Sequence, residues 1–419
     1  MMASTLVQES WPVSADGLDE WAGEFEAFHA RFARFFARRE PWDAARVYLC
    51  GLMAPVQRKN CWQMAEATGA KDPQAMQRLL WGAHWDADAV RDELQGFVVE
   101  RFGDAGGIGI VDETGFLKQG TKSVGVKRQY CGTAGKVTNC QVGVFLSYRT
   151  RNGYTFLDRR LYLPEEWCQD WGRRREAHVP DEVAFGTKPQ LAIEMLEHAW
   201  ERGVPMKWIA ADAVYGDDTR FRDRVAGAGK QYVLAVSVNT PVWRERQPVE
   251  VCLSSKRGRP RTQPRLASGA AAWERVSSVV AALPRQRWKR FAVGRGEKGP
   301  RMYDWARVRI LEKRGAVQGP EGWLLARRSI SDPKEMAYYL SNARRSASLA
   351  SLAEVAGARW SIETAIEEGK GEVGLDEYEV RYWHSWHRHV TLSMMAHAWL
   401  ASIRQRAGEK LLTHPNWRS

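Results

Sequence analysis

Three acidic residues are spaced so that two β-strands and one helix would carry them. Asp112 and Asp212 each end a short apolar run with β character, and Glu363 lies in a segment whose polar residues recur at helical spacing. Carboxylates are the hard oxygen ligands that Mg²⁺ and Mn²⁺ prefer. Two such ions activate a water or a 3′-hydroxyl and stabilise the leaving oxygen of an in-line displacement. The spacing therefore predicts a two-metal site for phosphoryl transfer.

Simpler explanations exist for each acid taken alone. An aspartate after a strand commonly caps a turn or helix, and a glutamate on a helix between basic residues commonly forms surface ion pairs. Asp217 and Asp218 precede a helical pattern and are expected mainly as N-caps. Glu113 is expected to point away from Asp112 if the strand continues. The sequence has no G-x-x-x-x-G-K-[ST] motif, so nucleotide hydrolysis has no support.

The segments around these acids predict a mixed α+β fold. Residues 1–100 show helical spacing of apolar residues, and strand-like texture begins near residue 106. Three strands in a meander, then alternating helix and strand, favour a mixed sheet with helices on its faces. The alternation breaks over 240–330, where short β-like pieces predict an inserted β-rich subdomain. Helices are expected to return from residue 331 onwards.

The charge of the chain favours a polyanionic partner. Lys and Arg number 62 against 50 Asp and Glu, which gives a net charge of +12. Such an excess indicates nucleic acid first and an anionic membrane second. The six cysteines include no C-x-x-C pair, so neither a zinc site nor a disulfide framework is predicted. The N-terminus has no signal-peptide pattern, and the apolar segment 392–403 is too short for a membrane span, so a cytoplasmic location is expected.

Two basic segments and one helical pair are expected to contact DNA. Short helices joined by a turn with Gly69 resemble a helix-turn-helix with Gln77 and Arg78 toward the groove, although an ordinary helical hairpin explains the same pattern. The run 256–261 resembles a minor-groove hook, and a solvated loop that contacts only phosphates explains it equally. The expected basic contacts, from this run and the Gly- and Lys-rich segment 120–138, are Lys122, Lys127, Arg128, Lys256, Arg257, Arg259 and Arg261.

On three of its motifs the chain resembles the DDE transposases of bacterial insertion sequences. The motifs are Val111-Asp-Glu-Thr-Gly-Phe-Leu-Lys, Asp212-Ala-Val-Tyr-Gly, and Arg359-Trp-Ser-Ile-Glu followed by Lys370-Gly-Glu-Val-Gly. One branch of these transposases has tyrosine, arginine, glutamate and lysine at gaps of two, three and six residues. Arg359, Glu363 and Lys370 match the last three places, whereas Ala356 takes the place of the tyrosine. Ala213 stands where relatives often have an acidic residue.

The resemblance implies an RNase H-like catalytic domain interrupted by an insertion. Asp112, Asp212 and Glu363 would be the catalytic and metal-binding triad for Mg²⁺, with Mn²⁺ as a substitute, and Arg359 and Lys370 would lie near DNA phosphates. The expected division begins with a helix-turn-helix-like DNA-binding domain at 1–100. The first part of the catalytic core follows at 101–239, and the β-rich insertion occupies 240–330. The second part of the core and the C-terminal helices occupy 331–419.

The resemblance also implies a function and its partners. The expected function is metal-dependent cleavage of double-stranded DNA at terminal inverted repeats and strand transfer to target DNA, by a homodimer at the bacterial nucleoid. Base stacking on an insertion-domain aromatic is expected of Trp288, Trp305 or Trp323. Two other interpretations remain open: a domesticated, catalytically inactive DNA-binding protein, and a metal-dependent nuclease without strand transfer.

Overall fold

The computed structural model describes residues 15–250, 264–296 and 299–413. Its helices are α1 (Ala15–Ala30), α2 (Arg39–Met53), α3 (Cys61–Thr68), α4 (Gln74–Trp81), α5 (Ala87–Phe102), α6 (Glu165–Gln169), α7 (Trp171–Glu176), α8 (Lys188–Glu201), α9 (Ala213–Gly216), α10 (Thr219–Gly227), α11 (Val276–Ala281), α12 (Leu349–Ala358), α13 (Trp360–Val373) and α14 (Trp383–Thr413). Its strands are β1 (Gly107–Leu117), β2 (Lys127–Cys131), β3 (Lys136–Thr150), β4 (Gly153–Tyr162), β5 (Met206–Ala211), β6 (Gln231–Val236), β7 (Pro241–Trp243), β8 (Val249–Glu250), β9 (Arg265–Leu266), β10 (Glu274–Arg275), β11 (Lys289–Gly296), β12 (Gly299–Arg314), β13 (Val317–Ser329) and β14 (Met336–Ser341).

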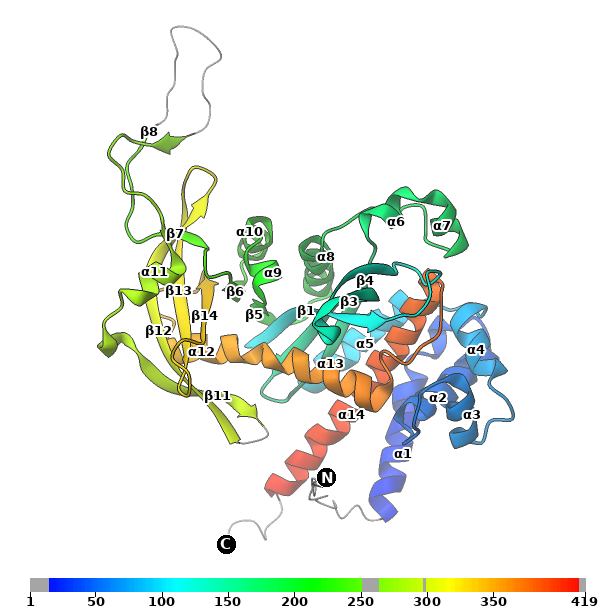
Figure 1. Ribbon diagram of the computed structural model, residues 1–419. Helices are drawn as coiled ribbons and strands as arrows, with labels where there is room; N and C mark the ends of the chain where they lie inside the picture. The colour runs from blue at the N-terminus through cyan, green and yellow to red at the C-terminus, as the bar shows by residue number, and fades with distance from the viewer. Residues whose placement is uncertain (1–14, 251–263, 297–298, 414–419) are drawn as a thin grey trace, which may run out of the picture.

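A mixed sheet forms the centre of the molecule. Strands β1, β3 and β4 make an antiparallel meander, and β5 and β6 add to the other edge of β1 in parallel. The first half of β1 is fully buried, as expected for a strand covered on both faces. Figure 1 shows α8 and α10 on one side of this sheet and α13 on the other. This arrangement confirms the predicted mixed α+β class.

The strands of the segment 240–330 extend the central sheet. Strand β14 pairs antiparallel with β13 on one side and with β6 on the other. It therefore joins the strands of this segment to the central strands β6, β5 and β1 in a single sheet. The helix predicted after residue 331 is therefore wrong for residues 336–341. Tyr338 and Tyr339 are good strand formers, and two neighbouring strands satisfy the backbone hydrogen bonds of this segment.

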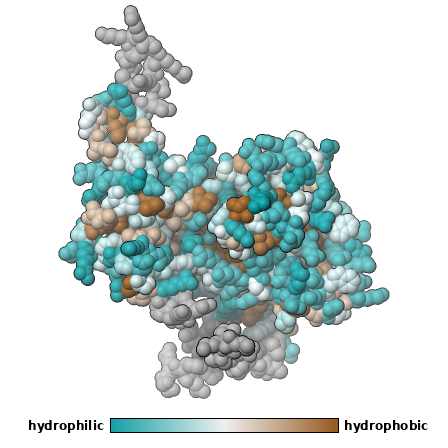
Figure 2. Space-filling model, in the orientation of Figure 1, coloured by the Kyte–Doolittle hydropathy of each residue, from teal (hydrophilic) through white to brown (hydrophobic). Residues whose placement is uncertain are grey.

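The N-terminal helices pack against the C-terminal helix α14, which also lies on β4. Phe28 of α1 contacts Trp399 of α14 with their ring centroids 5.4 Å apart. Helix α1 ends at Ala30, and α2 begins after a short 3₁₀ turn. Of the described helices, none is long and apolar enough to cross a membrane. Figure 2 shows hydrophilic residues over most of the displayed face.

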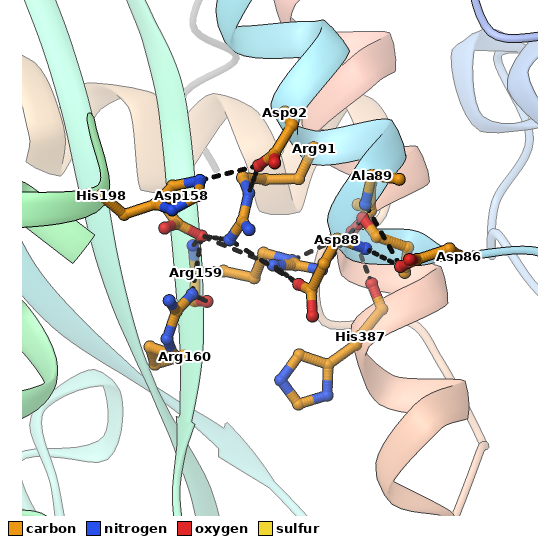
Figure 3. A network of polar contacts seen from close by, with 12 residues as sticks. Asp86, Asp88, Ala89, Arg91, Asp92, Asp158, Arg159, Arg160, His198 and His387 are labelled. Atoms are coloured by element: carbon orange, nitrogen blue, oxygen red, sulfur yellow. Dashed lines mark hydrogen bonds and ion pairs between the residues drawn. The ribbon is translucent and has the colours of Figure 1, made fainter. Parts of the chain in front are cut away.

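A buried network of charges joins α5 to β4 (Figure 3). Asp158 of β4 is fully buried and accepts hydrogen bonds from Arg91 at 2.6 Å and Arg160 at 2.9 Å. Arg159, also fully buried, donates to Asp88 at 2.7 Å. Burial raises the pKa of Asp158, but the surrounding arginines hold it below its usual value. These buried ion pairs connect α5 to β4, and removal of one partner would leave a buried charge without compensation.

Candidate active site

The two aspartates of the predicted triad lie beside each other on neighbouring parallel strands. Val111 of β1 pairs with Ala211, the last residue of β5, so Asp212 directly follows β5 and Asp112 directly follows the paired part of β1. The expectation that the strand of Asp112 ends there is wrong, because β1 continues to Leu117 along β3. Adjacent strands are about 4.8 Å apart, so the two aspartates are close neighbours. Asp212 also caps α9, because its Oδ1 accepts a hydrogen bond from the backbone N–H of Val214 at 2.9 Å. The cap function that explains this aspartate alone thus coexists with its place beside Asp112.

Glu363 lies on α13 and is linked to Asp112 through Arg359. Helices α12 and α13 meet at Arg359, whose backbone stays helical. The Arg359 guanidinium donates to Oδ2 of Asp112 at 3.2 Å and to Oε1 of Glu363 at 2.5 Å. One side chain therefore spans from the aspartate of β1 to the glutamate of α13. The structure places Arg359 between Asp112 and Glu363, with Asp212 after the strand that pairs with β1.

The electrostatics of this cluster show an excess of negative charge. Burial is the main cause that raises the pKa of Asp112 to about 7; the Asp212 and Glu113 carboxylates raise it further, and Arg359 opposes the shift. Burial likewise raises the pKa of Asp212, and Glu113 adds to the effect. Buried carboxylates of like charge, with raised pKa values, are the setting that a divalent cation stabilises.

The donor chemistry of the cluster fits a divalent metal ion. Asp112 and Asp212 offer hard oxygen atoms, and each uses one oxygen in a hydrogen bond with backbone N–H. Among the described residues, no three His, Cys, Asp or Glu side chains are already gathered closely enough to hold an ion. Arg359 supplies positive charge between Asp112 and Glu363 instead.

Glu113 has partners that the sequence did not indicate. Its Oε2 accepts a hydrogen bond from the hydroxyl of Tyr215 at 2.7 Å, and its Oε1 accepts from Nζ of Lys188 at 2.6 Å. Tyr215 is fully buried and lies one turn after Asp212. Glu113 therefore ties β1 to the turn that carries the second aspartate. The only sequence signal for this link is the tyrosine in the Asp212-Ala-Val-Tyr motif.

The expected cap roles hold for one of two neighbouring aspartates. Asp218 caps α10 by accepting from the backbone N–H of Phe221 at 2.9 Å. Asp217 instead accepts from the hydroxyl of Thr240 at 2.9 Å and from the backbone N–H of Ser237 at 3.1 Å. It thereby fixes the chain after β6 rather than the start of a helix.

Lys370 lies at the far end of α13, two turns beyond Glu363. Its Nζ donates to the carbonyl oxygen of Gly115 at 3.2 Å and to the hydroxyl of Thr133 at 3.1 Å. Burial lowers the pKa of this ammonium group. Ala356, in the place of the signature tyrosine, is buried inside α12.

The other residues predicted to contact DNA lie away from the three carboxylates. Lys122 pairs with Glu176 at 2.6 Å, and Lys127 pairs with Glu166. Arg128 is exposed on β2, and Gln77 and Arg78 are exposed on α4. Lys256, Arg257, Arg259 and Arg261 lie outside the described residues.

Of the three tryptophans expected to stack on bases, one is buried. Trp305 is fully buried against Tyr339 and cannot reach a base without unfolding its strand, so that expectation is wrong for it. Trp288 and Trp323 are partly exposed, and arginine guanidinium groups cover their rings at 4.2 and 4.1 Å.

Comparison with known proteins identifies the family. Residues 25–300 match the DDE superfamily endonucleases. The chain belongs to this family. The match includes Asp112 and Asp212 and ends before Glu363. The resemblance inferred from the three sequence motifs is thereby confirmed at the level of the family.

One curated relative and one solved structure are similar to this DDE endonuclease. The relative is the probable transposase for insertion sequence element IS701 of Microchaete diplosiphon, 27% identical over 200 residues. The aligned part is 47% of this chain and 50% of the relative, so the chain spans about half the length of that protein. The structure, a piggyBac transposase synaptic complex with hairpin DNA, has a TM-score of 0.36 and 11% identity, and the alignment covers 95% of this chain and 79% of that chain. That score is too low to guide the assignment.

Proposed function

We propose that this DDE endonuclease is the transposase of an insertion sequence, which cuts DNA at the element ends and joins the 3′ ends to target DNA. The observation that carries the proposal is the single guanidinium that joins Asp112 to Glu363, with Asp212 on the adjacent strand. It supports assigning the three acids to one site, although β1 and α13 are far apart in the chain. The similarity of this chain to the probable transposase of an insertion sequence supports the same assignment.

The proposed cofactor is Mg²⁺, for which Mn²⁺ would substitute. Asp112 and Asp212 would bridge the metal ions, and Glu363 would hold the second. When bound, the ions supply an activated water or 3′-hydroxyl and stabilise the leaving oxygen. Before an ion binds, Arg359 would offset the negative charge of Asp112 and Glu363. Once an ion takes its place, the planar guanidinium would be free to form two hydrogen bonds with a DNA phosphate.

The proposed partners are the terminal inverted repeats, the target DNA and a second copy of the chain. Lys370 and Arg359 would contact phosphates beside the cleaved bond. Residues 1–100 would form the DNA-binding domain, 101–239 and 331–419 the two parts of the catalytic core, and 240–330 the insertion. Gln77 and Arg78 would contact a groove, and their exposure on α4 supports this role.

The test uses a plasmid that carries the reading frame with its natural flanking DNA. Purified protein with Mg²⁺ is expected to cut at both flanks and to join the released ends to a second plasmid. Asp112→Asn, which keeps the side-chain volume, is expected to retain DNA binding and to lose cleavage by about a thousand-fold or more. Cutting without joining would indicate a nuclease, and binding without cutting by the unaltered protein would indicate a DNA-binding protein only.

A further inference from the structure

The β2–β3 hairpin (residues 127–138) forms the edge of the central sheet next to the candidate active site. Strand β2 is the last in the strand order and pairs only with β3 along its length. From Lys118 to Thr138 the chain has five Lys or Arg residues and no Asp or Glu. An edge that lacks any acidic residue repels other cationic surfaces and attracts a polyanion.

The outer face of this hairpin combines apolar and cationic side chains. Tyr130 and Val137 lie opposite each other in the ladder, and they are 64% and 54% exposed. Arg128 is exposed on the same face, two residues before Tyr130, whereas Lys136 is exposed near the tip and, next to Val137 in β3, belongs to the opposite face. Neither forms an ion pair with any described residue, whereas Lys127 is paired with Glu166. Two apolar side chains with an unpaired cation on their own face and another near the tip make a surface that suits both a base and its flanking phosphates.

The tip of the hairpin is tied to the active site. The Thr133 hydroxyl donates to the carbonyl oxygen of Gly115 at 3.2 Å, and Nζ of Lys370 donates to both groups. Gly115 lies on β1, three residues after Asp112. Lys370 and Glu363 are seven residues apart on α13, which corresponds to about 10 Å at a rise of 1.5 Å per residue. That distance corresponds to about three nucleotides of a strand at 3.4 Å each.

A purely structural role accounts for part of this pattern. An aromatic residue opposite a β-branched residue stabilises a hairpin by roughly 0.2–1 kcal/mol. Such a pair does not require the absence of acids over the whole segment. It also does not require a tip that is hydrogen-bonded to the helix of Glu363. These features are better explained by a ligand that passes along the hairpin into the active site.

We propose that the β2–β3 hairpin is a base-stacking element for DNA, in which Tyr130 stacks on an unpaired base a few nucleotides from the cleaved bond. Val137 packs against the same nucleotide, and Arg128 and Lys136 contact the flanking phosphates. Stacking of bases on aromatic residues tolerates any sequence, because every base has a π face. The proposal rests on the proposed function and extends it, since it assigns an unpaired strand to a named surface outside the insertion.

The test measures binding of the full chain to two 30-base-pair oligonucleotide duplexes without added metal. One duplex is fully paired, and the other has a central three-base bubble with 2-aminopurine. The unaltered protein is expected to quench the 2-aminopurine and to prefer the bubble by about ten-fold, the range seen when stacked aromatics are replaced. Tyr130→Thr keeps strand propensity and is expected to lose both effects, whereas Tyr130→Phe is expected to keep them.

Charge variants separate stacking from phosphate contact. Arg128→Gln with Lys136→Gln is expected to weaken binding to both duplexes equally and to reduce the dependence of log Kd on log salt by about two phosphate contacts. Tyr130→Thr is expected to leave that salt dependence unchanged. Matching quenching and bubble preference in Tyr130→Thr and the unaltered protein would overturn the proposal. Equal loss on both duplexes together with a lower Tm would also overturn it, since the role would then be structural.

Failure of this proposal is distinguishable from failure of the proposed function. If the unaltered protein cuts the plasmid flanks but Tyr130→Thr behaves like it on the bubble, only the hairpin assignment falls. If the unaltered protein quenches the 2-aminopurine and prefers the bubble, and Tyr130→Thr does neither, but no flank is cut, the hairpin assignment stands and the transposase assignment falls.

Discussion

The guanidinium of Arg359 donates a hydrogen bond to Asp112 at 3.2 Å, although 247 positions separate the two residues in the chain. The same guanidinium contacts Glu363, so one positive charge lies beside two carboxylates, of which Asp112 is the more buried. A divalent ion needs the same oxygen atoms. On the proposed function, Arg359 and a metal ion would therefore compete for the site, and the arginine would become available for a phosphate when the ion binds.

Replacing Arg359 by Gln is expected to raise the affinity for Mn²⁺ in the absence of DNA. Removing one charge beside two ligands stabilises the bound ion, and a gain of about 1.4 kcal/mol corresponds to ten-fold. Isothermal titration with MnCl₂ measures the effect. Arg359→Lys keeps the charge and is expected to bind Mn²⁺ as the unaltered protein does. Equal affinity in all three proteins would contradict the competition.

The raised pKa of Asp112 predicts a pH-dependent stability in metal-free protein. The group ionises near 3.8 when unfolded and near 7 when folded, so between these values the folded state binds more protons. The free energy of unfolding is therefore expected to fall as pH rises from about 4 to about 7, by a few kcal/mol at most. Urea denaturation in EDTA at pH 4.5 and pH 7.5 measures it.

Asp112→Asn provides the control for this pH effect. Asparagine does not ionise, so the variant is expected to gain stability relative to the unaltered protein at pH 7.5 and to lose that gain at pH 4.5. Parallel pH profiles for the two proteins would show that another group titrates.

Tyr215→Phe is expected to reduce cleavage by ten-fold or more and to lower the free energy of unfolding by about 1–2 kcal/mol. The variant removes the hydroxyl that holds Glu113 and, through it, the turn of Asp212. Tyr232→Phe is a matched control, because Tyr232 is also buried and donates to Glu312 at 2.7 Å. It is expected to lose similar stability and to cut DNA normally. Equal cleavage in both variants would remove the positioning role.

Arg91→Met is expected to lower the free energy of unfolding by about 3–5 kcal/mol, because it leaves the charge of Asp158 buried with fewer partners. Lys122→Gln breaks a surface pair with Glu176 and is expected to change it by less than about 1 kcal/mol. Urea denaturation compares the two. A small effect for Arg91→Met would mean that Arg159 and Arg160 suffice.

Local patterns were enough to predict the positions of the acids. The buried half of β1 and residues 208–211 of β5 form short apolar runs, because neighbours cover them on both faces, so Asp112 and Asp212 stand out where the runs meet polar residues. The polar spacing from Arg359 to Lys370 likewise indicated one helix face. These signals come from residues close in the chain.

What could not be predicted depends on distant pairing. The segment of β14 was expected to be helical; it forms a strand between β13, which precedes it in the chain, and the distant β6. The contacts of Glu113 with Lys188 and Tyr215 exist only once three elements meet. Arg359 was expected near phosphates, and its contact with Asp112 has no signal in the local sequence.

The pairing of β14 with β6 has a mechanical consequence. Strand β6 pairs with β5, and Asp212 follows β5, so two successive ladders of hydrogen bonds connect the strand before α12 to a carboxylate of the proposed triad. A sheet resists shear between its strands far more than a flexible linker does. A force exerted on the long β12 and β13 strands would therefore shift the position of Asp212 rather than bend a hinge.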